Sequence, residues 1–176
     1  MFGTKLVLRR RTVGALMATA AIAAGMITVS SATAAPFWGG YYPVPRDSGS
    51  GERIVYSQTL MHVWVVNAAG QKVRDYPVTG RDDWPVPGTY SVYSKSPTAD
   101  NPEYKARWRH FVRFAKGHRY AIGFHDIPIN YAGQPVQTED DLGMPGDGAG
   151  CVRQSTGDAV FLYKWARIGT KVVVLE

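Results

Sequence analysis

The chain has 176 residues, 20 Lys and Arg side chains against 14 Asp and Glu, a net charge of +6, and one cysteine. Four of the basic residues and none of the acidic ones lie in residues 1–34, so the rest of the chain carries 16 against 14, or +2. The positive charge is therefore mostly a property of the N-terminus and does not indicate a nucleic-acid-binding protein. One cysteine excludes a disulfide within the chain and leaves a disulfide to another molecule, a reactive thiol or an inert buried thiol.

The N-terminus has the pattern of a secretory signal peptide. Lys5 and residues 9–11 are basic, residues 13–29 are small and apolar, and Ala32-Thr33-Ala34 offers the small residues that a signal peptidase reads. The apolar run is short and weakly hydrophobic for a membrane span, although an uncleaved anchor is the alternative. We expect residues 1–34 to be removed near Ala34, so that the protein meets the membrane only during export and is then secreted, periplasmic or held in the cell wall.

Residues 35–52 are rich in Gly, Pro, Tyr and Ser without a period, which predicts a flexible linker. Residues 53–176 are long enough for one domain, and their many aromatic, Gly and Pro residues favour short strands and turns. β-branched and aromatic patterns predict strands at residues 53–58, 61–66, 71–77, 88–93, 109–114, 119–124 and 171–175. Residues 97–107 read as a polar loop, and residues 127–149 as a long loop of the kind that is often functional.

One helix is predicted after the cysteine. Ser155 or Thr156 can cap its N-terminus, Asp158 suits its first turn, and Gly169 is expected to close it at the C′ position. The sequence shows no internal repeat and no second domain.

The surroundings of Cys151 suit a nucleophile. The preceding glycines let the backbone approach a substrate closely, and consecutive amides in such a turn can form a nest for an oxyanion. Arg153 places a positive charge two residues away, which favours the thiolate. The dipole of the following helix would also favour the thiolate if the N-terminus of the helix points at the sulfur. Arg153 is also a candidate for binding a substrate carboxylate, with a structural ion pair as the alternative.

A cysteine nucleophile needs a base, which is usually a histidine. His62 and His110 lie inside predicted strands and His118 lies in a tight turn, where packing or exposure to solvent accounts for them. His125 follows the apolar strand 121–124 and opens the long loop that leads to the cysteine. Catalytic groups are often placed at such positions, so His125 is the preferred candidate. The scattered histidines show no spacing typical of metal ligands.

Several stretches resemble the L,D-transpeptidase catalytic domain of the YkuD type, over roughly residues 54–175. The matching stretches are Trp84-Pro85-Val86-Pro87-Gly88-Thr89-Tyr90, Phe111-Val112-Arg113-Phe114, Gly123-Phe124-His125, Gly148-Ala149-Gly150-Cys151-Val152-Arg153, the helix from Asp158 and the exit at Gly169-Thr170-Lys171-Val172. The sequence departs from the family pattern at Gly148 and Ala149, which stand where the family has Ser and His. Asp126 stands where relatives often carry Ser, and the gap between His125 and Cys151 is longer than usual.

The resemblance implies a mostly β fold, a YkuD-like sandwich or barrel with one helix after the cysteine and a long active-site loop. It implies Cys151 as nucleophile, His125 as base, and the backbone amides of Ala149 and Gly150 as oxyanion donors. Arg153 and Asp126 are the expected substrate-binding residues.

The implied activity is peptidoglycan acyl transfer that forms 3→3 crosslinks, or L,D-carboxypeptidase hydrolysis. Peptidoglycan stem peptides are the expected partners of a monomer that needs no cofactor and no metal. A second hypothesis is a wall-binding or structural protein that keeps the fold but has lost turnover. A papain-like amidase fits less well, because Cys151 follows the candidate histidine along the chain.

Overall fold

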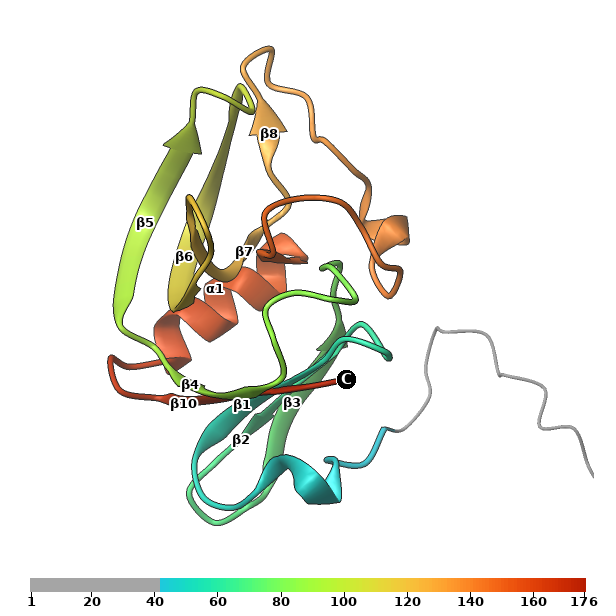
Figure 1. Cartoon of the computed structure of the whole chain (residues 1–176), viewed down its shortest axis with the longest axis vertical. Helices are drawn as coiled ribbons and strands as arrows, with labels where there is room; N and C mark the ends of the chain where they lie inside the picture. The colour runs from blue at the N-terminus through green and yellow to red at the C-terminus, as the bar shows by residue number, and fades with distance from the viewer. Residues whose placement is uncertain (1–41) are drawn as a thin grey trace, which may run out of the picture. The chain divides into compact units, whose positions relative to one another are not determined.

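The computed structural model describes residues 42–176; the predicted signal peptide, residues 1–34, and the first part of the predicted linker lie outside the described residues. The described part contains two β-sheets and one α-helix (Figure 1). The strands and the helix are β1 (Arg53–Ser57), β2 (His62–Val66), β3 (Lys72–Pro77), β4 (Gly88–Ser91), β5 (Ser94–Asn101), β6 (Ala106–Lys116), β7 (Ala121–Asp126), β8 (Ile129–Asn130), β9 (Val152–Gln154), α1 (Thr156–Trp165) and β10 (Lys171–Leu175).

The first sheet has the strand order β3-β2-β1-β10-β4, and β1 and β10 run parallel at its centre. Every residue of β1 and β2 is buried, which requires cover on both faces of the sheet. One face contributes to the main core, and on the other Val55, Trp64 and Val66 pack against Tyr42 and Val44. The described part of the predicted flexible linker therefore lies against the domain, and its carbonyl at Tyr42 accepts a hydrogen bond from the Trp64 indole at 3.1 Å.

The second sheet has the order β5-β6-β7-β9, with β8 paired to β6. The predicted loop at residues 97–107 was wrong except at residues 102–105, which form a turn, because Ser94–Asn101 forms β5 and pairs antiparallel with β6. β5 is an edge strand, and only at an edge can polar residues and Pro97 be accommodated without breaking a ladder. The polar residues and the proline that predicted a loop therefore reflect the position of β5 at the edge of the sheet.

The helix α1 begins where the sequence predicted but ends earlier. Ser155 is the N-cap, and its hydroxyl accepts a hydrogen bond from the Asp158 amide at 3.1 Å. The helix ends at Trp165 with Ala166 as its C-cap, so the expectation that Gly169 closes it was wrong. Gly169, with φ of +90°, instead lies in the following turn, where its N–H donates to the Val92 carbonyl.

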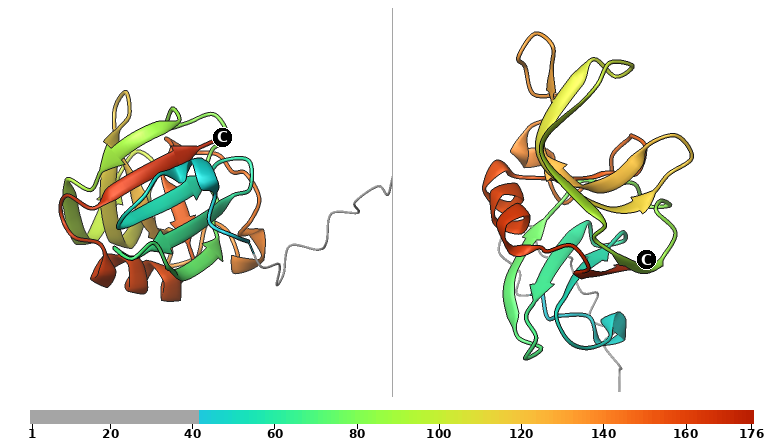
Figure 2. Two further views of the ribbon diagram at one scale, coloured as in Figure 1. Left: turned by 90° about the horizontal axis from the view of Figure 1, so that it is seen from below. Right: turned by 90° about the vertical axis from the view of Figure 1, so that its left-hand side faces the viewer.

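The main core lies between the two sheets, and α1 packs against β6, β7 and β9 (Figure 2). Buried side chains from both sheets meet there, among them Ile54, Tyr56 and Val63 from the first sheet and Val112, Phe124 and Val152 from the second. The long segment between β7 and β9 contains β8 and a short 3-10 helix at Glu139–Asp141. Because β9 pairs parallel with β7, the chain after this segment returns to lie beside the strand that precedes it.

Candidate active site

The parallel pairing of β7 and β9 places Cys151 beside His125. The register pairs Phe124 with Val152 and His125 with Arg153. Continuing that register by one residue pairs Cys151 with Gly123, so His125 and Cys151 project from the same face of the sheet. Strand spacing puts their Cα atoms roughly 8 Å apart, a distance that the two side chains can span.

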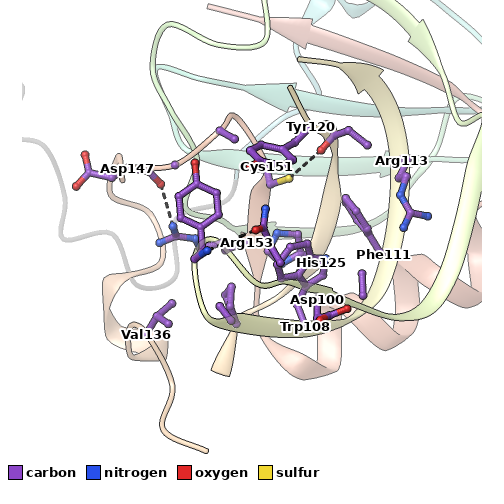
Figure 3. A pocket seen from close by; sticks show the side chains of 18 residues that line it. Asp100, Trp108, Phe111, Arg113, Tyr120, His125, Val136, Asp147, Cys151 and Arg153 are labelled. Carbon is purple, nitrogen blue, oxygen red and sulfur yellow. Dashed lines mark hydrogen bonds between the residues drawn. The ribbon is translucent and has the colours of Figure 1, made fainter. Parts of the chain in front are cut away.

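Both side chains line one pocket with a volume of about 390 Å³ (Figure 3). The strand wall of this pocket comes from β6 and β7, and it carries His125, Trp108, Phe111 and Arg113. The loop wall comes from the end of the long segment and from β9. The loop-wall residues are Asp147, Gly148, Ala149, Cys151 and Arg153.

The His125 ring is held on three sides. Its Nδ1 lies 2.6 Å from the backbone carbonyl of Asp126, Trp108 stacks on it at 5.0 Å between ring centroids, and Phe111 meets it edge-on at 5.5 Å. A carbonyl oxygen can only accept, so Nδ1 carries the proton and Nε2 keeps its lone pair. This tautomer is the one that can take a proton from a thiol.

Burial keeps both groups neutral in the unliganded site. Loss of solvation lowers the pKa of His125 to about 4, despite its hydrogen bond to the Asp126 backbone. Loss of solvation also raises the pKa of the Cys151 thiol to about 11, although the Gly123 backbone, Arg153 and Arg113 each act to lower it. Arg153 thus lowers the pKa of the thiol, as the sequence predicted, but desolvation is the larger effect and the net shift is upward.

The helix contributes little to the thiol, because β9 separates Cys151 from the first turn of α1 and a helix dipole acts mainly within its end turn. The hydrogen bond that Cys151 Sγ makes is to the Ala121 carbonyl, at 3.5 Å. Within residues 42–176, no hydrogen bond joins this sulfur to His125. Such bonds are often long in free enzymes and form when substrate arrives.

Arginine side chains hold the turn before Cys151 by its carbonyl groups. Arg153 Nη2 donates to the Asp147 carbonyl at 2.9 Å, and Arg81 Nη1 donates to the Gly148 carbonyl at 3.4 Å. Among the hydrogen bonds of residues 42–176, none uses the backbone N–H of Gly148, Ala149 or Gly150 as donor. The turn thus has several uncommitted donors next to the sulfur.

Gly150 cannot be replaced without moving this turn. Its φ is +105°, and a Cβ added there would lie 2.5 Å from Trp84 Cδ1. The residue is buried beneath the Trp84 ring, which in turn stacks on His118 at 5.4 Å. Trp84 therefore supports the turn from outside the pocket, a contact that the sequence did not predict.

Arg153 and Asp126, the predicted substrate-binding residues, both make hydrogen bonds within the protein. Arg153 Nη1 donates to Gln137 Oε1 at 2.7 Å while Nη2 holds the Asp147 carbonyl, so both terminal nitrogens are used by the protein. The Asp126 carboxylate is buried and accepts from the backbone N–H and the Nε of Arg109, at 2.6 and 2.8 Å. Asp126 does not line the pocket, and it reaches His125 only through its backbone carbonyl.

The other histidines lie elsewhere. His62 pairs with Asp75 at 3.1 Å in the first sheet, His110 faces the Tyr163 ring, and His118 stacks on Trp84. Among the residues that the structure describes, His125 is the histidine that lines the pocket. The sequence did not predict Trp108 and Arg113 as pocket residues. Phe111 and Arg113 alternate along β6, which could have indicated a shared face, whereas Trp108 is an odd number of residues from both, and His110 between Trp108 and Phe111 has an irregular backbone with φ of +58°.

Comparisons with known proteins show the family of the chain. The family model of the L,D-transpeptidase catalytic domain, YkuD, matches residues 51–174. The chain belongs to this family. A comparison with curated protein sequences found no match.

Solved structures share the YkuD fold. An L,D-transpeptidase from Mycobacterium smegmatis has a TM-score of 0.57 at 20% identity, covering 73% of this chain and 60% of that one. L,D-transpeptidase 3 from Mycobacterium tuberculosis, solved with a faropenem-derived adduct, has a TM-score of 0.52 at 22% identity, with 73% and 61% covered. A further L,D-transpeptidase from M. tuberculosis H37Rv has a TM-score of 0.53 at 25% identity, with 73% and 59% covered.

This YkuD domain thus spans about three fifths of the length of those relatives. Its mostly β architecture of two sheets and one helix is the fold that the resemblance implied. Within residues 42–176, no group of three or more His, Cys, Asp or Glu side chains is arranged to hold a metal ion. In the same range, no helix is long and apolar enough to cross a membrane.

Proposed function

We propose that the chain is an exported cysteine acyltransferase of peptidoglycan, an L,D-transpeptidase that forms 3→3 crosslinks through an acyl-enzyme on Cys151. The observation that carries this proposal is that Cys151 and His125 line one pocket, beside the uncommitted amides of residues 148–150. Membership of the L,D-transpeptidase family supports the same reaction class. The substrate is the stem peptide of peptidoglycan, and the protein acts as a monomer after export.

In the first half-reaction, the Cys151 sulfur attacks the carbonyl of the third residue of a stem tetrapeptide. Because the resting thiol and imidazole are both neutral, the thiol proton passes to His125 Nε2 as the C–S bond forms. The amides of Ala149, Gly150 and Cys151 stabilise the oxyanion. The imidazolium then gives its proton to the leaving amine of the terminal D-alanine, and a thioester remains.

In the second half-reaction, a nucleophile attacks the thioester and gives its proton to His125. An amine from a neighbouring stem produces a 3→3 crosslink, whereas water produces a tripeptide and makes the protein an L,D-carboxypeptidase. Collapse of the tetrahedral intermediate expels the thiolate, which recovers its proton from the imidazolium. The long segment between β7 and β9 forms one wall of the space that the second substrate must enter.

A specific observation favours a second candidate function, a wall-binding protein with impaired turnover. Ala149 lies in the pocket wall where the family pattern has a histidine, so the site lacks one polar side chain. The raised pKa of Cys151 also leaves almost no thiolate at neutral pH. A protein of this kind would bind stem peptides without forming a thioester.

The deciding experiment is covalent labelling of the intact protein. Faropenem is the probe, and the expected result is a mass increase on the wild type that is absent in Cys151→Ala. A stem tetrapeptide, with and without an acceptor amine, then distinguishes crosslinked dimer from tripeptide as product. Tetrapeptide binding with no adduct from either reagent would contradict the enzyme and support the wall-binding protein.

The variant Ala149→His tests whether the missing histidine side chain is what separates an active acyltransferase from a wall-binding protein. If the missing side chain limits turnover, restoring it increases the rate of adduct formation in the variant. An Ala149→Ser variant serves as the matched control, because it adds a polar group without an imidazole.

A further inference from the structure

Arg113 lines the pocket, and only part of its hydrogen-bonding capacity is used by the protein. It is half-buried on β6, its guanidinium lies 4.1 Å above the Phe111 ring, and its Nη1 donates to Ser94 Oγ at 3.2 Å. Among the ion pairs of residues 42–176, none involves Arg113. Its Nη2 and Nε make no hydrogen bond within the same range.

Arg153 has the opposite arrangement. Both of its terminal nitrogens donate to oxygen atoms of the protein, Gln137 Oε1 and the Asp147 carbonyl. A guanidinium has five N–H groups and binds a carboxylate best with two parallel ones; hydrogen bonds take one N–H from each terminal nitrogen of Arg153, whereas Arg113 keeps its whole Nε/Nη2 edge. Of these two arginines in the pocket, Arg113 is therefore the one equipped for a ligand.

Arg113 lies near the reacting sulfur. Its charge acts at Cys151, where it lowers the pKa of the thiol alongside Arg153. Figure 3 shows the two arginines on opposite sides of Cys151, with Arg113 on the side of Phe111. The Phe111 ring under the guanidinium fixes its plane, which reduces the entropy lost when a ligand binds.

We propose that Arg113 binds a free carboxylate of the acyl donor and selects donors that carry one beside the scissile amide. This inference rests on the proposed function and specifies its donor. The carboxylate has two possible sources, the C-terminus of the leaving D-residue and the side chain of the residue that becomes the acyl group. Either would place a negative charge within a few atoms of the carbonyl that Cys151 attacks, and would satisfy the free N–H groups of Arg113.

The test uses four stem tetrapeptides that differ only in amidation, at the C-terminus, at the side-chain carboxyl, at both or at neither. The rate of thioester formation on the wild-type protein is followed by intact mass. A charge-assisted bidentate pair predicts that amidation at the relevant carboxyl slows acylation by about 10- to 100-fold. Which single amide causes the loss identifies the source of the carboxylate.

The Arg113→Gln variant links that preference to the side chain. We expect the ratio of rates for acid and amide donors to fall to about 1 in Arg113→Gln and to an intermediate value in Arg113→Lys, which keeps the charge but not the fork. The control is Arg107→Gln, an exposed arginine of the same strand outside the pocket, which should keep the wild-type ratio. Circular dichroism checks folding, and Arg113→Lys carries the test if Arg113→Gln does not fold.

Equal rates for all four donors in the wild type, or an unchanged preference in Arg113→Gln, would overturn the role of Arg113 while leaving the acyltransferase intact. Calorimetric affinities of the same donors for Cys151→Ala, with and without Arg113→Gln, measure carboxylate binding in the absence of chemistry. If the wild type forms no thioester and no faropenem adduct, the proposed function fails. A preference for acid donors in the calorimetric experiment would then still support Arg113 as a carboxylate site, and its absence would reject it.

Discussion

The two walls of the pocket are built by different forces. The strand wall, on β6 and β7, is held by ladder hydrogen bonds and by close aromatic packing around His125. The loop wall, which ends at Cys151, is held by arginine side chains that grip backbone carbonyls and by Trp84 packed on Gly150. Packing therefore sets the environment of the proposed base, His125, whereas polar contacts and backbone conformation position the proposed oxyanion donors next to Cys151. Variants in the two walls should fail in different ways.

The largest effect is expected on the strand wall, at His125 itself. Loss of a general base costs about 100- to 10,000-fold in rate, so faropenem acylation of His125→Gln should fall by that factor while the fold is kept. The control is His62→Gln, a buried histidine of the first sheet that pairs with Asp75. A comparable loss in both variants would show that His125 acts through stability rather than as the base.

On the loop wall, Gly150→Ala tests the backbone. Its φ of +105° and the 2.5 Å approach of Trp84 Cδ1 force the turn to move, so we expect about 100-fold slower acylation from displaced oxyanion donors. Gly133→Ala is the matched control in the same long segment, because its φ is +82° and nothing lies within 4 Å of the added Cβ. Gly133→Ala should lose about 1–2 kcal/mol of stability from backbone strain with its acylation rate retained.

Arg153→Met tests whether side-chain contacts hold the loop wall. Loss of the bonds to Gln137 and to the Asp147 carbonyl should cost about 2 kcal/mol in the free energy of unfolding and about tenfold in acylation rate. Denaturant unfolding and faropenem labelling measure the two effects. In Arg167→Met, which removes an exposed pair with Glu52, the change in stability should stay within about 0.5 kcal/mol.

We expect Trp108→Ala to have the smallest effect on the acylation rate at neutral pH. This variant tests whether packing in the strand wall sets the pKa of His125. The neutral imidazole is the active form, so acylation is lost as pH falls through the pKa of His125, which burial lowers to about 4. Removing the stacked indole lets water reach the ring and raises that pKa towards its ordinary value of 6.5, so the acid limb of the pH–rate profile moves to higher pH. Trp165→Phe, outside the pocket, should leave the limb in place, and a limb unmoved in Trp108→Ala would reject packing as the cause.

Much of the fold could be predicted because its signals are local. β-branched and aromatic residues predicted the strands β2, β3, β6, β7 and β10. Failures occurred where tertiary context decided the outcome. β5 is polar and contains a proline, and it becomes a strand only because β6 offers it a free edge. Gly169 satisfies the pattern of a helix end, but the chain leaves the helix three residues earlier to form another turn.

The candidate site shows the same division. Cys151 and His125 could be chosen from the sequence because a glycine-rich turn and a strand end are local features. The roles of Arg153 and Asp126 could not, because each depends on partners distant in the chain or on the face that the strand presents. Arg113 lies in a stretch that matches the family but was not predicted as a site residue, since only its lack of an ion pair within residues 42–176 distinguishes it.

The sequence by itself determined the residue types of the candidate site, the family and the position of most strands along the chain, because periodicity, turn residues and short motifs act over a few positions. Only the tertiary structure decided the protonation state of the pair, since the lowered pKa of His125 and the raised pKa of Cys151 both come from side chains that burial brings together. It also decided which arginine is free to meet a substrate. Hydrogen bonds across the fold commit Arg153 to the loop and leave Arg113 facing the pocket.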